Sequence, residues 1–214
     1  MIDWAVLNQM VYEGKASEVR AMVQQALDEG LPAHQILREG LIGGMLVVGE
    51  DFKHNRLYVP EVLIASRAMK AGVALLRPLM ALAHEEMPAV ATVVIGTITG
   101  DLHDMGKNLV CMTAEGAGFR VIDLGVDVPA QAFVDAARQH KADIVAVSAL
   151  LTTTMPGLRD VVAALRKDKS LDHVKICVGG APVSQMFADE IGADGYAADA
   201  GSAPQLFNTV LEGR

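Results

Sequence analysis

The chain has few aromatic residues, few cysteines and no long apolar run. Aromatic side chains make up only 4% of its 214 residues although 51% are hydrophobic, so the core is built mainly from Ala, Val, Leu, Ile and Met. No apolar stretch approaches the roughly 20 residues that span a bilayer, so no membrane segment is expected. The two cysteines, Cys111 and Cys177, lie far apart in the sequence. They are interpreted as small buried hydrophobic residues of a reducing compartment.

Several common ligand-binding patterns are also missing. No strand is followed by Gly-x-Gly-x-x-Gly, and neither Gly-x-x-x-x-Gly-Lys-Ser/Thr nor Gly-x-Ser-x-Gly occurs, which argues against dinucleotide, nucleoside triphosphate and serine hydrolase sites. The net charge is −8 and no block of Lys or Arg offers a phosphate footprint, so nucleic acid is not an expected partner. Asp3 interrupts the apolar start and no small-residue cleavage site follows. We therefore expect no signal peptide and a cytoplasmic protein.

The first part of the chain, residues 1–88, shows helical periodicity and no strand pattern. Apolar residues recur at intervals of three and four along one segment, as expected for one face of a helix: Val19, Met22, Val23, Ala26 and Leu27. A third segment runs from about Ala33 to Asp51, and a fourth runs from Pro60 towards His84, with Pro78 expected to kink or shorten it. Four helices with short connections predict an antiparallel four-helix bundle.

From Ala91 onward the pattern alternates between strand and helix. Strands are predicted near residues 91–98, 119–124, 143–149, 174–178 and 194–197. Helices are predicted near residues 105–117, 130–140, 155–167, 184–191 and 202–212. Five such units with short loops predict a doubly wound, five-stranded parallel sheet with helices on both faces. Residues 83–89 are the expected linker, which divides the chain into domains 1–88 and 89–214.

One loop carries the pattern of a metal ligand. Residues 101–106 read Asp-Leu-His-Asp-Met-Gly and follow the apolar run 91–98, so His103 lies at the carboxyl edge of the predicted sheet, where α/β proteins bind ligands. One imidazole nitrogen can face a metal while the other donates to Asp101, which fixes the tautomer of the ring. Alone, the pattern also fits an ordinary loop histidine beside a helix-capping aspartate.

Two further elements end neighbouring strands and converge on the same edge. Ser148 and Leu150 follow the third strand, and Gly179-Gly180 follows the fourth. The other histidines are scattered, whereas a zinc site built from protein alone needs three or four ligands. A single histidine suits a metal that brings most of its own ligands in a planar macrocycle. Ser148 is expected to hydrogen-bond Asp101, and the glycines leave room for a bulky group, although a tight turn explains the glycine pair equally well.

Taken together, these spaced elements resemble the corrinoid-binding pattern of cobalamin-dependent methyltransferases and mutases. The helical half resembles the cap of methyl-transferring members, through residues 44–52, 58–63 and 66–70. The likeness covers nearly the whole chain and is closest to small corrinoid proteins that shuttle methyl groups from methanol, methylamines or methoxylated aromatics. It implies a corrinoid cofactor with cobalt, and a Rossmann-like or flavodoxin-like domain behind the cap.

The resemblance also implies roles for individual residues. His103 is the lower cobalt ligand in place of the cofactor's own nucleotide base, and Asp101 and Ser148 continue the ligand relay. Further cofactor contacts within the first element are Leu102, Asp104, Met105, Gly106 and Asn108. The displaced nucleotide tail enters a slot lined by Ser148, Leu150, Thr152, Gly179, Gly180 and Ala181, with Tyr196, Ala197 and Asp199 near its end. The cap residues expected over the upper face of the corrin are Met45, Val48, Gly49, Phe52, Tyr58, Val59 and Val62. Tyr58 departs from the Phe that relatives often have there.

The expected function is that of a methyl carrier that is not catalytic alone. By resemblance, a substrate:corrinoid methyltransferase loads it, and a methylcorrinoid:acceptor methyltransferase unloads it to tetrahydrofolate, tetrahydromethanopterin or a thiol. A reductive activator protein is a third implied partner. Two alternatives remain open: a corrinoid-dependent regulator or sensor, for which no output module is evident, and the small subunit of an adenosylcobalamin mutase, which generally lacks such a cap.

Overall fold

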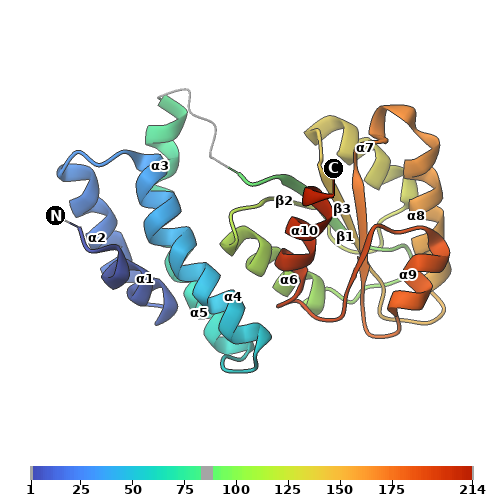
Figure 1. Ribbon diagram of the computed structural model, residues 1–214, viewed down its shortest axis with the longest axis horizontal. Coiled ribbons are helices and arrows are strands. Elements are labelled where there is room, and N and C mark those ends of the chain that lie inside the picture. Colours follow the sequence, from blue (N-terminus) through green and yellow to red (C-terminus); the bar gives the residue numbers. More distant parts are fainter. Residues whose placement is uncertain (1, 83–88, 214) are drawn as a thin grey trace. The chain divides into compact units, whose positions relative to one another are not determined.

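The computed structural model describes residues 2–82 and 89–213 (Figure 1). The chain divides into two compact units: Met1–Val90 with Glu115–Gly118, and Ala91–Ala114 with Phe119–Arg214. Residues 83–88, the larger part of the expected linker, lie outside the described residues.

The first unit is helical throughout, as predicted. The longest helix, α5, contacts all the other helices of the unit. The apolar stripe predicted around residue 23 faces the interior, where Val19, Val23 and Ala26 are buried. At the start of α1 the Asp3 carboxylate accepts a hydrogen bond from the Ala5 N–H, at 2.9 Å, and so caps the helix. The helical segments are α1 (Trp4–Tyr12), α2 (Ala16–Asp28), α3 (Ala33–Gln35), η1 (Ile36–Ile42), α4 (Gly43–Lys53) and α5 (Val59–Leu82).

Two details of this unit differ from the sequence prediction. The predicted third helix contains a π-helical stretch, η1, between α3 and α4, and it ends at Lys53 rather than near Asp51. Pro78 lies inside α5 and the helix continues to Leu82, so Pro78 does not end it. The packing of α5 against its neighbours holds the helix together at this point, although a proline lacks the N–H that the ladder would use.

The second unit contains a five-stranded, all-parallel sheet with the order β2-β1-β3-β4-β5. Helices connect the strands, so the prediction of a doubly wound α/β fold after a helical half is confirmed. The strands are β1 (Thr92–Thr97), β2 (Arg120–Asp123), β3 (Ile144–Ser148), β4 (Lys175–Gly179) and β5 (Gly195–Ala197). The helices are α6 (Met105–Gly116), α7 (Ala130–His140), α8 (Met155–Lys167), η2 (Lys169–Leu171), α9 (Gln185–Ile191) and α10 (Ala203–Glu212).

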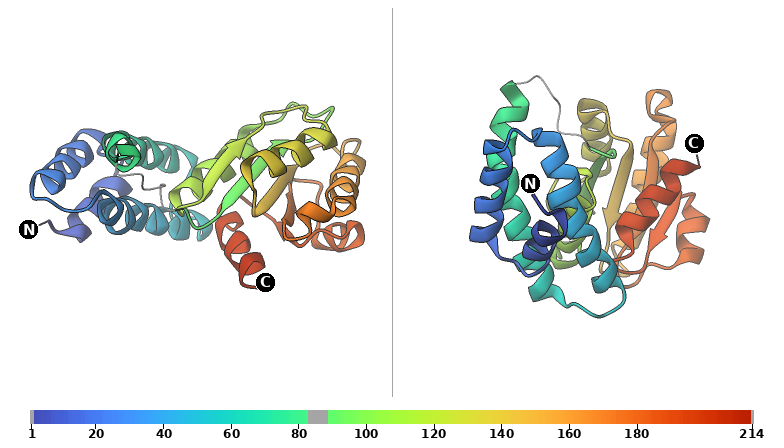
Figure 2. Two further views of the ribbon diagram at one scale, coloured as in Figure 1. Left: turned by 90° about the horizontal axis from the view of Figure 1, so that it is seen from above. Right: turned by 60° about the vertical axis from the view of Figure 1, so that its left-hand side comes forward.

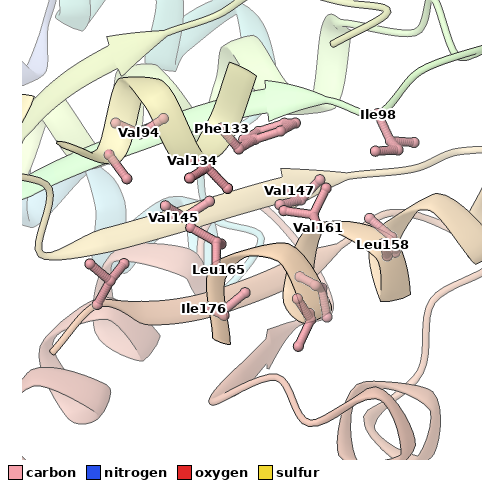
Figure 3. Close-up of a cluster of buried hydrophobic side chains, with 14 of the residues drawn as sticks. Val94, Ile98, Phe133, Val134, Val145, Val147, Leu158, Val161, Leu165 and Ile176 are labelled. Carbon is pink, nitrogen blue, oxygen red and sulfur yellow. The ribbon is translucent and has the colours of Figure 1, made fainter. Parts of the chain in front are cut away.

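The two faces of the sheet are covered differently (Figure 2). Helices α7, α8 and α9 cover one face, and their apolar side chains form the main core with alternate strand residues, among them Val94, Val145 and Ile176 (Figure 3). Helices α6 and α10 cover the other face; there Phe207 of α10 packs edge-on against Phe119, with ring centroids 5.6 Å apart. Because side chains alternate along a strand, Ile95, Ala146 and Cys177 point towards α6 and α10 instead of into the main core.

The strand order places the β1 and β3 loops next to each other. β1 pairs with β3 on one side and with β2 on the other, so the connections leaving β1 and β3 diverge at the carboxyl edge. Such a topological switch point is the usual ligand site of an open parallel sheet. Across the described ranges, no helix combines the length and apolarity that crossing a membrane requires.

Candidate functional site

The predicted ligand loop, residues 98–104, begins at the end of β1 and ends at the start of α6. Asp101 has no exposed surface, whereas the side chain of His103 is 52% exposed and lies at the sheet edge. The Asp101 Oδ1 atom accepts two hydrogen bonds from His103, one from the ring Nδ1 at 2.7 Å and one from the backbone N–H at 3.1 Å. The carboxylate therefore fixes both the backbone and the ring of the histidine.

The second oxygen of Asp101 is held by the loop that follows β3. Oδ2 accepts hydrogen bonds from the Leu150 N–H at 2.7 Å, from the Leu151 N–H at 3.2 Å and from the Thr154 hydroxyl at 2.9 Å. The sequence analysis expected the Ser148 hydroxyl here, and this is a correction: Ser148 is not among the donors to Asp101. Ser148 ends β3 and lines the neighbouring cavity, while the turn after it wraps around the carboxylate and brings up Thr154.

These contacts keep Asp101 ionised. Burial by itself raises the pKa of its carboxyl group, but hydrogen bonds from Leu150, His103 and Thr154 outweigh that effect and hold the pKa well below its ordinary value. An ionised carboxylate only accepts hydrogen bonds, so Nδ1 of His103 carries the proton that is donated. In the neutral ring with this tautomer, the other nitrogen, Nε2, presents its lone pair, which is the form in which imidazole binds a metal.

Beside the histidine lies a cavity of about 630 Å³. It is bounded by the sheet face that α6 and α10 cover, by those two helices and by the loops at the carboxyl edge. Its strand residues include Ile95, Ala146 and Cys177, and its helix residues include Val110 and Phe207. Desolvation by burial raises the pKa of the Cys177 thiol to about 12, so this side chain stays protonated and serves as an apolar wall.

Two glycines line the mouth of this cavity, one beside open space and one where the backbone leaves no room for a side chain. An added Cβ at Gly106 would meet no atom within 4 Å, so space remains beside the first turn of α6. Gly180 has φ +123°, and a Cβ there would lie 1.8 Å from the Ala149 carbonyl oxygen, so only glycine fits. A planar group therefore has room beside His103 to approach the backbone. The residues present fit a cofactor whose metal takes one protein nitrogen and whose remaining bulk needs an apolar slot.

Most of the predicted site residues of the second unit line this cavity: Leu102, His103, Asp104, Met105, Gly106, Ser148, Leu150, Gly179, Gly180, Ala181, Ala197 and Asp199. Asp101 lies behind His103. Asn108, Thr152 and Tyr196 are not among the lining residues, although Asn108 hydrogen-bonds Asp104, at 3.0 Å.

The predicted cap residues of the first unit differ in exposure. Met45, Val48 and Val62 are buried. Gly49 and Phe52 are partly buried. Tyr58 is 66% exposed and Val59 is also exposed, so these two have free surface for a ligand.

Sequence reasoning missed several residues of the site. Thr154 lies 53 positions from the carboxylate that it binds, and a lone threonine in a turn gives no signal of that contact. Lys107 lines the cavity, yet its charged side chain is only 1% exposed. Ile95, Ala146 and Cys177 were predicted only as strand core, although their alternation with Val94, Val145 and Ile176 marks them as members of the opposite face.

Comparison with known proteins agrees with this geometry. A family described as B12 binding domain matches residues 91–204, and a second family with the same description matches residues 5–77. A chain with this fold and these two matches is a B12-binding protein.

Individual relatives place the chain in a narrower class of B12-binding proteins. A corrinoid protein of Desulfitobacterium hafniense is 40% identical over 206 residues, covering 96% of this chain and 95% of the relative. Dimethylamine corrinoid protein 2 of Methanosarcina acetivorans is 40% identical over 208 residues, covering 97% and 95%. The methanol:cobalamin methyltransferase complex of Methanosarcina barkeri contains a chain that superimposes with a TM-score of 0.87 at 27% identity, covering 97% of this chain and 79% of that one. The chain belongs to the corrinoid proteins of methyltransferase systems, and its cofactor is a corrinoid.

Proposed function

We propose that this protein is the methyl shuttle of a multicomponent methyltransferase, and that His103 binds the cobalt of its corrinoid from below. When bound, the corrinoid supplies a cobalt atom that takes up a methyl group and releases it again. The observation that carries the proposal is the Asp101–His103 pair, in which a buried ionised carboxylate leaves the ring Nε2 free at the mouth of an apolar cavity.

The residues around the cavity act by binding and by excluding water. We assign the nucleotide tail of the corrinoid to the slot between the sheet and helices α6 and α10. Ala146, Cys177 and Phe207 surround it with apolar surface, and Gly106 leaves space at the entrance beside the first turn of α6. Asp101 holds the histidine ring in the orientation and protonation state that a metal ligand needs.

We assign a separate role to the helical unit. It is the cap that the sequence predicts for residues 1–88. Exposed apolar side chains of α4, α5 and the loop between them offer area suited to an apolar ligand or partner, and they include Leu46, Val47, Tyr58, Val59 and Leu63. We assign these side chains to shielding the bound cofactor from water between encounters with partner enzymes.

Three kinds of partner follow from a shuttle role. A substrate:corrinoid methyltransferase delivers the methyl group, and the relative named for dimethylamine favours a methylated amine as its source. A second methyltransferase removes the methyl group to tetrahydrofolate, tetrahydromethanopterin or a thiol. A reductive activator restores corrinoid that has been oxidised.

The decisive experiment identifies the lower cobalt ligand. The protein is labelled with 15N-histidine and reconstituted with unlabelled cobalamin, and the electron paramagnetic resonance spectrum of the cobalt(II) form is recorded. A superhyperfine pattern that changes with the isotope places imidazole on cobalt; His103→Ala abolishes the change, and His173→Ala, an exposed histidine of the same unit, preserves it. A pattern from the tail base in the wild-type protein overturns the ligand assignment. Transfer of radiolabelled methyl from dimethylamine, in the presence of the organism's own amine methyltransferase, tests the shuttle role.

A further inference from the structure

A short segment next to the ligand loop has no part in the cavity, yet it is bonded to that loop at several points. Residues 123–128, called the brace below, connect β2 to α7 and contribute no lining residue. We propose that the brace sets the position of His103, with Asp127 and Asp123 as positioning residues. The inference rests on the proposed role of His103 as cobalt ligand.

Asp127 provides the first attachment. Its φ of +55° lies in the left-handed region, which few residues other than glycine adopt and which aspartate and asparagine tolerate best. In this conformation the Asp127 N–H donates to the Asp101 carbonyl oxygen at 3.1 Å, and its Oδ1 accepts from the Gly100 N–H at 2.7 Å. One exposed residue thus binds the backbone on both sides of the peptide that precedes Asp101. Unfavoured backbone conformations persist where such contacts hold them.

Asp123 provides the second attachment, through Lys107. The Lys107 ammonium group is buried, and it donates to Asp123 Oδ2 at 2.5 Å and to Asn108 Oδ1 at 2.7 Å. Buried lysines are rare unless paired, so this contact fixes the first turn of α6 to the end of β2. Asn108 passes the contact on to Asp104, the residue next to His103, through its side-chain amide at 3.0 Å.

A third link runs through the middle of the brace. The Gly125 carbonyl oxygen accepts from the Thr97 N–H at 3.0 Å, and the Thr97 hydroxyl donates to the His103 carbonyl oxygen at 2.9 Å. Thr97 is fully buried, so its hydroxyl has one defined position. The backbone before, at and after His103 is therefore attached to the same segment.

These attachments matter because the histidine ring is half exposed and is hydrogen-bonded to Asp101 alone among the described residues that contact its Nδ1 atom. Its placement depends on the loop backbone, which the brace holds. Groups that bond a metal ligand directly change metal affinity or activity by about 10–100-fold when they are replaced. The brace lies one bond further out, so its loss is expected to weaken corrinoid retention by less than that range, about 3–10-fold.

Two variants of Asp127 and one control distinguish the effect of its side chain from the effect of its backbone conformation. Asp127→Gly tolerates the left-handed conformation but removes the Oδ1 acceptor, whereas Asp127→Asn retains both. Lys141→Gly is the matched control, because Lys141 is exposed, has φ +51° and ends α7 at the opposite edge of the sheet. Each variant is tested for cobalamin affinity, thermal unfolding and the 15N-histidine superhyperfine pattern.

The proposal expects weaker affinity and an altered or mixed axial-ligand spectrum for Asp127→Gly, with wild-type behaviour for Asp127→Asn and Lys141→Gly. Lys107→Met tests the second attachment by the same criteria, and it leaves Asp123, whose side chain is 40% exposed, accessible to water. Wild-type affinity and spectrum in both Asp127→Gly and Lys107→Met, even with a lowered unfolding temperature, overturn the brace. An absence of imidazole on cobalt in the wild-type protein overturns the ligand assignment instead.

Discussion

Replacing Gly106 with alanine separates folding from cofactor binding, because the structure predicts opposite effects on the two. Gly106 is the second residue of α6, and an added Cβ meets no protein atom within 4 Å. Alanine in place of glycine within a helix is worth about 0.5–1 kcal/mol. In a chain of this length that gain raises the unfolding temperature of the apoprotein by about 1–4 °C.

The same methyl group enters the mouth of the cavity. Where a ligand fills that space, the alanine methyl group forces the ligand or its neighbours to shift. In a close-packed interior such shifts cost about 1–3 kcal/mol. Such a cost corresponds to corrinoid affinity weaker by about 5–150-fold.

The assay pairs calorimetry of the apoprotein with a spectrophotometric titration by cobalamin. Gly106→Leu extends the series, since leucine is nearly as good a helix former as alanine but fills more of the cavity. Affinity should fall from glycine to alanine to leucine while the helix stays intact. Cobalamin affinity in Gly106→Ala equal to that of the wild type would show that the corrinoid does not lie against α6, and the assignment of the cavity would be refuted.

Two further substitutions test the contacts around the carboxylate and the tight turn. Thr154→Val removes one of the donors to the ionised Asp101 and is expected to lower the free energy of unfolding in urea by about 1.5–3 kcal/mol, whereas Ser148→Ala should cost about 0.5 kcal/mol or less. A larger loss for Ser148→Ala would contradict the hydrogen-bond pattern at Asp101. Gly180→Ala combines a disfavoured backbone conformation with a Cβ 1.8 Å from the Ala149 carbonyl oxygen. The free energy of unfolding in urea should therefore fall by at least about 3 kcal/mol. An unfolding midpoint equal to that of the wild type would exclude this turn geometry.

The sequence predicts the α/β half of the fold closely, because its signals are local. Strand and helix boundaries fall within a residue or two of those predicted, since apolar runs and the changes between them mark these boundaries directly. The Asp101–His103 pair is predictable for the same reason: only Leu102 lies between the partners, and one loop holds both. Periodicity likewise predicts the helical half as a bundle.

Contacts between distant segments are not predictable in this way. The Thr154 hydroxyl reaches Asp101 only because β1 and β3 are neighbours and their loops meet at the switch point. The burial of Lys107 depends on Asp123, which comes from another strand end. The π-helical turns of η1 add residues that a period of 3.6 does not anticipate, and the continuation of α5 past Pro78 depends on packing rather than on propensity.

Substitutions at adjacent residues of the central strands affect different properties of the protein. Val145 belongs to the main core and its neighbour Ala146 to the wall of the cavity. Selection at Val145 acts on the stability of the fold. Selection at Ala146 acts on the shape of the cavity. Under the proposed assignment of this cavity to the nucleotide tail, substitutions at Ala146 or Cys177 change the shape of the slot while the opposite face preserves the architecture. The sheet allows the choice of cofactor to evolve separately from the stability of the protein that carries it.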